Sequence, residues 1–482
     1  MVRSDSKSYE ALLEAAGGFR YYQVVLLLWF QSTLTVVVAN MAFMVFGGIT
    51  PEAPVVNGTL NETTAPPVRF NSLVTEWQLY GKRAYIVHLI TSLQMASVFI
   101  GTIVVGQVSD RFGRRIASIG AIALMSLAGF AGGFSPHWSV TVVCLSLAAV
   151  GAGATISAQF VLITEQLVQR WRAVVYVGGW PLGYVIFSSI AMFLHDWRHL
   201  TLITNLLGLI PIAMFPLIYE SPKWLLERRG LEVGTKVLAK IRKRNLLPPD
   251  TSRIRSESQA FMAEELEHRP ARSYSYVDVL VRDSWANLRR RYALLLVFFA
   301  IATCNYGTLF STGRLAGDTA LNMLLFSLPR VVVNACVFLA DKFIRRLGRR
   351  HVMSAGLLLF GLCTTGISVV IVFWPQDGDR LPLPVTILAG LAINGGALCW
   401  IAGEMLSVEM FPTVWRNMGN ALCNDSGRIG SILAPQLLLL GTYWAPTPFI
   451  IFSITCFTCR LMETHQRVIE GKTDTRKVYL AI

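Results

Sequence analysis

Long runs of apolar residues alternate along this chain with short polar segments. Eleven of the runs reach about 20 residues, long enough for a helix to cross the ~30 Å hydrocarbon core of a bilayer. Lipid offers no water to backbone amide groups, so each run is expected to form an α-helix. The runs occupy residues 22–48, 84–108, 116–134, 138–162, 173–195, 199–219, 292–313, 319–341, 351–374, 382–405 and 418–440, and a weaker twelfth run occupies 443–461.

Two parts of the sequence repeat each other. Glu165 and Arg172 close one apolar run with the same spacing that Glu409 and Arg416 show at the end of another. A basic motif at residues 110–115, D-R-F-G-R-R, recurs in looser form as an aspartate at 341 and G-R-R at 348–350. A duplication on this scale inside lipid predicts an all-α membrane protein, with two pseudo-symmetric six-helix bundles around a central cavity. That architecture is typical of transporters.

Composition and charge agree with this prediction. Hydrophobic residues make up 53% of the chain and charged residues only 15%, too few to cover the surface of a soluble protein of this length. The net charge of +14 comes from Lys and Arg that lie mostly on one set of loops and termini. This distribution follows the positive-inside rule. Both termini and the 220–291 loop are therefore expected in the cytoplasm, and nucleic acid is not expected as a partner.

The pattern divides the chain into five parts: a cytoplasmic N-terminal segment (1–21), a first bundle (22–219), a cytoplasmic linker (220–291), a second bundle (292–461) and a cytoplasmic tail (462–482). The linker is expected to contain helices near 223–244 and 253–268, separated by a Pro-Pro break. The external loop (49–83) carries glycosylation sequons at Asn57 and Asn61. They favour a multi-pass glycoprotein of the plasma membrane. The last helix is expected to be short.

Several short motifs, each weak alone, occur together in order. Besides the motif at 110–115, they are Gly17-Gly18-Phe19, Thr75-Glu76-Trp77, Asp196-Trp197-Arg198, Glu220-Ser221-Pro222-Lys223-Trp224 and Glu409-Met410-Phe411-Pro412-Thr413. With these motifs the chain resembles the organic ion transporter family of the major facilitator superfamily, which includes organic cation, organic anion and carnitine carriers. The resemblance covers nearly everything from Tyr9 to about Ser453. It implies a twelve-helix carrier with a polyspecific central cavity that works by alternating access.

Charged residues at the cytoplasmic ends of the helices are expected to form a gate. Acidic and basic side chains there can pair across the two bundles and hold the cavity shut, then separate when it opens inward. The alternative is that these charges only anchor the topology at the membrane surface. The candidate gate residues are Asp110, Arg111, Arg114, Arg115, Glu165, Arg172, Glu220, Asp341, Arg349, Arg350, Glu409 and Arg416.

Two arginines, Arg330 and Arg428, lie near the middle of apolar runs. Each costs roughly 2.5 to 3.5 kcal/mol at that depth, so each needs a wet cavity and an acidic partner. Cation carriers of the family tend to have an acidic residue at the position of Arg428, whereas anion and carnitine carriers have Arg. The resemblance therefore favours an anionic substrate. Internal pairing with Glu404 or Asp425 remains the alternative, and Glu404 is also a candidate proton site or partner for the cationic end of a zwitterion.

Aromatic residues complete the predicted substrate site. Asn305-Tyr306-Gly307 resembles a Tyr-Gly step of the family, and Tyr306 is expected to face the substrate. Trp180, Tyr184 and Trp400 are candidates for stacking walls, although a packing role is equally open for each. The predicted substrate-binding residues are Arg428, Arg330, Tyr306, Asn305, Glu404, Trp400, Tyr184 and Trp180.

No catalytic motif, metal-ligand cluster or phosphate-binding loop is found in the sequence, so neither an enzyme nor a cofactor is expected. The main hypothesis is a facilitative or secondary-active transporter of small organic anions or zwitterions at the plasma membrane. Its partners would be the organic ion, the lipid bilayer and a coupling ion or exchange anion. The first alternative is an organic cation transporter. The second is a non-transporting membrane sensor or interaction protein, suggested by the short last helix.

Overall fold

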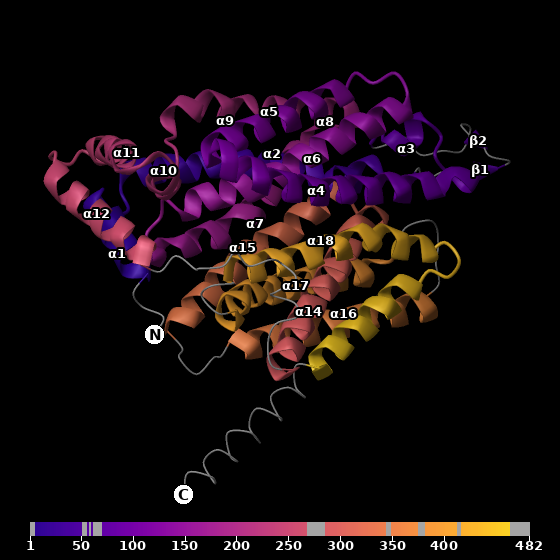
Figure 1. Cartoon of the computed structure of the whole chain (residues 1–482). Coiled ribbons are helices and arrows are strands. Elements are labelled where there is room, and N and C mark those ends of the chain that lie inside the picture. The colour runs from indigo at the N-terminus through magenta and orange to yellow at the C-terminus, as the bar shows by residue number, and fades with distance from the viewer. Residues whose placement is uncertain are drawn as a thin grey trace, which may run out of the picture. The chain divides into compact units, whose positions relative to one another are not determined.

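In a computed structural model, the chain is built almost entirely of helices (Figure 1). The structure describes residues 5–50, 55–56, 59–60, 70–267, 285–343, 349–374, 381–411 and 416–462. Two short antiparallel strands, β1 (Val55–Val56) and β2 (Thr59–Leu60), lie in the predicted external loop. Short helices α3 (Leu73–Glu76) and η1 (Gly81–Arg83) follow them.

The long helices of the first half lie where the apolar runs predict them. They are α2 (Tyr21–Gly47), α4 (Ala84–Phe112), α5 (Arg114–Gly132), α6 (Trp138–Thr164) and α7 (Gln169–Phe193). The run at 199–219 differs from the prediction because it forms α8 (Trp197–Leu206), α9 (Leu209–Met214) and the 3₁₀ turn η2 (Phe215–Leu217). Pro211 has no N–H to donate to the carbonyl of Leu207, so the helix is interrupted where that bond would form.

The second half contains α14 (Trp285–Phe310), η3 (Ser311–Arg314), α15 (Thr319–Phe343), α16 (Arg349–Phe373), α17 (Leu383–Met410) and α18 (Arg416–Leu440). A final apolar helix, Thr447–Met462, is short, as expected. Within the described residues, nine helical segments are long and apolar enough to span a membrane. Among the described residues α18 does not meet that criterion, and in α7 the described apolar stretch is the shorter Gly178–Phe193. Polar residues in α18 become important below.

The chain divides into two compact units. One comprises Met1–Phe43 and Ser97–Ser273, and the other comprises Met44–Ala96 and Tyr274–Ile482, so the boundary crosses α2 and α4. The division into domains at 22–219 and 292–461 remains a prediction.

Short helices gather at one end of the first unit (Figure 1). The helix α1 (Asp5–Ala15) packs with α10 (Pro222–Arg229), α11 (Leu231–Arg244) and α12 (Thr251–Glu267), in line with the helices expected in the linker. Leu12, Leu238 and Ile254 are fully buried between them. Tyr9 packs its ring 5.1 Å from that of Phe261. The N-terminal segment is thus attached to the linker by an apolar core of its own.

Small residues allow the helices of the second unit to approach closely. A Cβ atom added to Gly430 of α18 would lie 2.3 Å from the carbonyl oxygen of Phe299 in α14. A Cβ atom on Gly356 of α16 would lie 2.6 Å from the sulfur of Cys399 in α17. Close backbone approach is a common way for helices to associate in lipid, where little hydrophobic driving force acts between them.

Candidate functional site

A buried polar cluster lies on α17, α18 and α14 of the second unit. Asn420, Asn424 and Arg428 follow one another at four-residue intervals along α18, so they share one face of that helix. This face meets Glu404 of α17 and Tyr306 of α14. These five residues are called the arginine cluster below.

Arg428 is the cation of the cluster. Only 7% of the residue is exposed, and its Nη1 donates to the Tyr306 hydroxyl over 3.4 Å. No carboxylate oxygen in the described part of the chain lies within 4.0 Å of its guanidinium nitrogens. Arg428 therefore forms no direct ion pair with Glu404 or Asp425. Such internal pairing was the alternative that the sequence left open. A guanidinium has five N–H donors, and a neutral hydroxyl compensates little of its charge.

Glu404 has neutral amides as its nearest polar neighbours. It is 8% exposed, the side chains of Asn424 and Asn420 lie beside its carboxyl group, and Nδ2 of Asn424 donates to the carbonyl oxygen of Asn420 over 3.1 Å. The Asn420 amide is oriented by Ser407, whose hydroxyl donates to its Oδ1 over 2.7 Å. Arg428 acts on the carboxylate through its charge without contacting it. A carboxyl group and a guanidinium thus lie near each other, each with its charge uncompensated by a direct partner.

Two further predicted residues lie beside the cluster. Trp400 of α17 packs edge-on against Phe298, with ring centroids 5.9 Å apart at 66°. Its ring edge would meet a Cβ atom at Gly427, next to Arg428, at 3.4 Å. Asn305 is 9% exposed, and its Nδ2 is directed at Gly396 of α17, where an added Cβ atom would lie only 2.4 Å away. Asn305 therefore faces the α14–α17 contact.

The remaining predicted substrate residues lie on other helices. Arg330 is half-buried on α15, one turn after Phe326, whose carbonyl oxygen accepts from Asn394 of α17 over 3.4 Å. Trp180 and Tyr184 lie one turn apart on α7, in the first unit, where Tyr184 is buried and Trp180 half-buried. The structure thus gathers Arg428, Tyr306, Asn305, Trp400 and Glu404 on three neighbouring helices and places the other three elsewhere.

Candidate gate residues of the first unit form one connected network. Arg114, in the first turn of α5, forms an ion pair with Asp110 in the last turn of α4. Its Nε lies 3.6 Å from Oε2 of Glu165, directly after α6. The same Oε2 accepts from the Ser221 hydroxyl over 2.6 Å. Three helix ends are therefore linked through one arginine and two carboxylates.

Glu220 caps the start of α5. Its Oε1 and Oε2 accept from the backbone N–H of Arg115 at 3.0 and 3.2 Å. Burial raises the pKa of this carboxyl group, and the hydrogen bonds from backbone amides oppose the shift. Gly113 makes the approach possible, because its φ of +108° disfavours a side chain and an added Cβ atom would lie 2.4 Å from Glu220. Gly113 of the basic motif thus leaves the space that Glu220 needs to reach the start of α5.

The other candidate gate residues of this unit differ in their surroundings. Arg111 is exposed and lies 5.6 Å from the ring of Phe112. Arg172 donates from Nε to the carbonyl oxygen of Leu167 over 3.0 Å. The hydroxyl of Tyr9 donates to the carbonyl oxygen of Glu165 over 2.6 Å, and burial raises the pKa of this phenol well above its usual value. The N-terminal segment thereby contacts the gate network directly.

The equivalent region of the second unit is described only in part. Arg349, at the start of α16, donates to the carbonyl oxygen of Met405 over 3.5 Å. The side chains of Asp341, Glu409 and Arg416 lie outside the described residues, and pairing across the bundles remains a prediction. The sequons at Asn57 and Asn61 also lie outside them.

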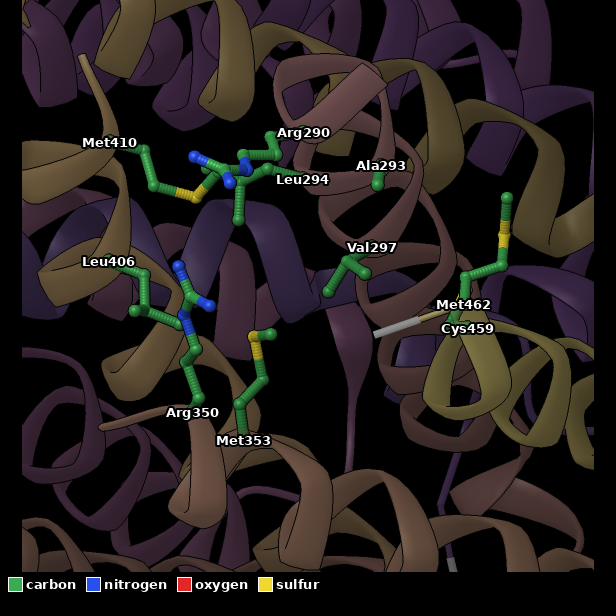
Figure 2. Close-up of a pocket in the computed structure, with 10 residues that line it drawn as sticks. All are labelled: Arg290, Ala293, Leu294, Val297, Arg350, Met353, Leu406, Met410, Cys459 and Met462. Atoms are coloured by element: carbon green, nitrogen blue, oxygen red, sulfur yellow. The ribbon is translucent and has the colours of Figure 1, made fainter. Parts of the chain in front are cut away.

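An apolar pocket lies near Arg350 at the ends of α14, α16, α17 and the last helix. It encloses about 430 Å³, including the part open to the surroundings. Figure 2 shows the guanidinium groups of Arg290 and Arg350 on one side, beside Met410 and Leu406, with Cys459 opposite. The pocket lies apart from the residues predicted for the substrate.

Sequence reasoning missed the two asparagines that hold Glu404. Asn420 and Asn424 are common polar residues, and neither carries a charge that would mark it inside a membrane span. Their four-residue spacing from Arg428 was the available signal. No group of metal-ligating side chains is found among the described residues, where all eight cysteines are free.

Comparisons with known proteins agree with this architecture. Residues 55–464 match the family model described as "Sugar (and other) transporter". The chain is 30% identical over 392 residues to solute carrier family 22 member 15 of Xenopus tropicalis, covering 80% of this chain and 70% of that protein. It is 28% identical over 401 residues to human organic cation/carnitine transporter 2, covering 82% and 69%.

Among solved structures, the chain is similar to the E. coli xylose transporter in a partially occluded inward-open conformation. The TM-score is 0.65 at 14% identity, covering 91% of this chain and 96% of that one. A likeness at this identity shows the fold alone, which is that of the major facilitator superfamily. Family and fold together confirm a membrane transporter rather than an enzyme. The chain belongs to the sugar (and other) transporter family of the major facilitator superfamily, and within it to solute carrier family 22.

Proposed function

We propose that this transporter moves small organic anions or zwitterions across the plasma membrane by alternating access, and that Arg428 binds the substrate carboxylate. The observation that supports this most is the buried guanidinium of Arg428, which has a tyrosine hydroxyl as its hydrogen-bond partner and no carboxylate within 4.0 Å in the described part. A charge at that depth is costly unless an opposite charge or water compensates it. A substrate anion supplies that charge during transport.

The chemistry of the guanidinium favours a carboxylate-sized anion. Its planar fork of donors can bind both oxygens of a carboxylate at once, which adds geometric selectivity to charge. The Tyr306 hydroxyl contacts Nη1 and can donate its own proton to the bound anion. Trp400 offers an aromatic wall one residue from Arg428 along α18.

A zwitterion fits the cluster as well as a simple anion. Its carboxylate would bind Arg428, while its ammonium group would lie against the face of an aromatic ring. The human relative is named an organic cation/carnitine transporter, which is consistent with a substrate that carries both groups.

One observation favours an organic cation instead. Glu404 is buried, and within the described part no Lys, Arg or His nitrogen lies within 4.0 Å of it. A substrate ammonium could fill that role. Two relatives, of Drosophila melanogaster and of human, are named as organic cation transporters. Cation transport is therefore the second candidate function.

The gate is proposed to involve the network of the first unit. Asp110, Arg114 and Glu165 connect three helix ends, and an arrangement of this kind can shift between two sets of ion pairs. The pairing partners in the second unit would be Glu409, Arg416 and the basic residues after α15. We also propose that the external loop is glycosylated and that both termini lie in the cytoplasm.

Counterflow uptake in proteoliposomes tests the substrate class. The panel contains a labelled dicarboxylate, carnitine and a quaternary ammonium ion, each measured with wild type, Arg428→Lys and Arg428→Ala. Anion and carnitine uptake should fall at least tenfold in Arg428→Ala and partly recover in Arg428→Lys, which keeps the charge but loses the fork. The control Arg83→Ala removes an exposed arginine of the same unit and should behave as wild type. Uptake of the ammonium ion alone would overturn the anion proposal, and no flux with any probe would favour the sensor hypothesis.

A further inference from the structure

The environment of Glu404 points to a second ligand of this transporter. We propose that Glu404 binds a proton, and that this proton is carried together with the substrate anion bound at Arg428. The inference rests on the proposed function, because it needs an anion at the neighbouring site. It goes beyond that function by naming the coupling ion and the residue that binds it.

The amide neighbours of Glu404 can serve both of its protonation states. The neutral side-chain amides of Asn420 and Asn424 lie beside the buried carboxyl group. A carboxylate accepts their N–H groups, whereas a protonated carboxyl group can still accept one of them and donate its own O–H elsewhere. A carboxylate that only stabilised the fold would be expected to have a cation in contact, since an unpaired charge inside a membrane is expensive. Among the residues that the structure describes, Glu404 has no such contact.

Charged and titratable groups around Glu404 come from three neighbouring helices. From α18, Arg428 acts on the carboxylate through its charge, and the Cys423 thiol also lies within electrostatic range. From α16, Arg349 donates to the carbonyl oxygen of the next residue, Met405. From α14, Arg291 lies 5.8 Å from the ring of Phe411, beyond the end of α17. None of these cations makes an ion pair with Glu404 within 4.0 Å.

Two further charged residues complete the surroundings. Asp425 of α18 is half-buried and faces the charge of Arg428. Arg330 is half-buried on α15, which packs against α17. Arg428 is therefore the cation whose field reaches the Glu404 carboxylate, and it is also the proposed anchor for the substrate.

The closeness of the Glu404 carboxyl group to the Arg428 guanidinium couples proton binding to anion binding. Asn424, whose side chain lies beside the Glu404 carboxyl group, lies about one α-helical turn before Arg428 on the same face of α18. When Glu404 is ionised, its negative charge weakens the attraction of Arg428 for an anion. Protonation removes that charge, and the anion then binds more tightly. By linkage, a bound anion makes protonation of Glu404 more favourable to the same extent.

The coupled step balances in charge and atoms. One proton from the medium adds to the Glu404 carboxylate and gives a neutral carboxyl group, while one monovalent anion binds Arg428. The loaded site has gained no net charge, so it can cross between its two open states without moving charge. Release of the anion on the other side weakens proton binding, and the proton leaves to that side.

The test separates coupling from transport itself. Proteoliposomes loaded at one pH are diluted into medium one unit more acidic, with a labelled monovalent carboxylate as probe. One-to-one coupling predicts accumulation of about tenfold at steady state. Counterflow of the same probe at equal pH on both sides measures transport without a proton gradient. Counterflow without gradient-driven accumulation would overturn the coupling and leave the proposed function standing, whereas no counterflow would overturn the proposed function.

Variants assign the proton site. Glu404→Gln should lose the gradient-driven accumulation, and its counterflow should no longer depend on pH. Glu404→Asp, which still titrates, should keep both properties. Asp425→Asn removes another carboxylate near Arg428 on α18, and counterflow by this variant should still depend on pH. If Glu404→Gln is poorly folded, purified wild type is tested instead. The anion is added in weak buffer, and a pH dye reports whether the protein takes up protons as the proposal predicts. No uptake of protons in that assay, or full accumulation by Glu404→Gln, would refute the assignment.

Discussion

The contact between α14 and α18 offers a quantitative test of how the arginine cluster is built. Gly430 lies two residues beyond Arg428, and a Cβ atom there would come within 2.3 Å of the Phe299 carbonyl oxygen and 2.7 Å of the Thr303 hydroxyl. Ordinary contacts of this kind are longer than 3.0 Å. In Gly430→Ala the two helices must therefore separate by at least several tenths of an ångström. Forcing a methyl group into a packed contact typically costs about 1 to 3 kcal/mol.

The same displacement should affect the substrate site. The bond from Arg428 to Tyr306 crosses between these two helices and is already 3.4 Å long. Any further separation breaks it, because hydrogen bonds are weak beyond about 3.5 Å. Gly430→Ala should thus lower both thermal stability in detergent and affinity for the carboxylate probe.

Gly120 supplies a matched control for this substitution. It lies within α5, and no atom lies within 4 Å of an added Cβ. Alanine is intrinsically better than glycine in a helix by roughly 1 kcal/mol, so Gly120→Ala should leave the melting temperature unchanged or raise it. Both variants are compared by the change in melting temperature and by probe binding. If Gly430→Ala melts like wild type and binds normally, the close packing of α14 and α18 described above is wrong.

Two further predictions concern the gate network. Because burial raises the pKa of Glu220 above its value in the unfolded chain, its contribution to stability is largest below the unfolded pKa of about 4.3 and is lost as pH rises through the folded pKa. Melting temperatures measured from pH 4 to 8 should show this decline, and Glu220→Gln should flatten it; an unchanged slope would assign the decline to other groups. Ser221→Ala removes both the cap of α10 and the hydrogen bond to Glu165. The loss should cost about 1 to 2 kcal/mol of stability and appear as a lower melting temperature. A melting temperature equal to that of wild type would contradict the role given to Ser221.

The sequence predicted the helices well because hydropathy responds directly to the solvent. The apolar runs form helices, and the helices differ from the predicted bounds where proline removes a backbone donor. Pro211 divided the sixth run, and Pro446 is followed by the start of the last helix at Thr447. Polar residues lower the hydropathy of α18, which carries Asn420, Asn424 and Arg428, the residues proposed here for the substrate site.

The candidate site was predicted unevenly. Arg428 and Glu404 could be identified because a charge in a membrane span is rare and costly. Their immediate partners could not, since asparagine and serine occur in spans for many reasons. The cap that Glu220 provides for α5 joins residues about a hundred positions apart, and no local pattern encodes such a contact. Residue type therefore concealed the partners of Glu404, and separation along the chain concealed the cap that Glu220 provides.

Selectivity between an acid and its neutral amide tests the central claim most directly. The two probes are an ammonium carboxylate of the carnitine type and its primary amide, which differ only in the group expected to meet Arg428. Binding to purified transporter is measured by titration calorimetry for wild type and Arg428→Gln. The account predicts that wild type prefers the carboxylate at least tenfold, since a charge-assisted pair contributes about 1.5 to 3 kcal/mol, and that Arg428→Gln loses this preference. Equal binding of the two probes by wild type, or an unchanged preference in Arg428→Gln, would contradict it.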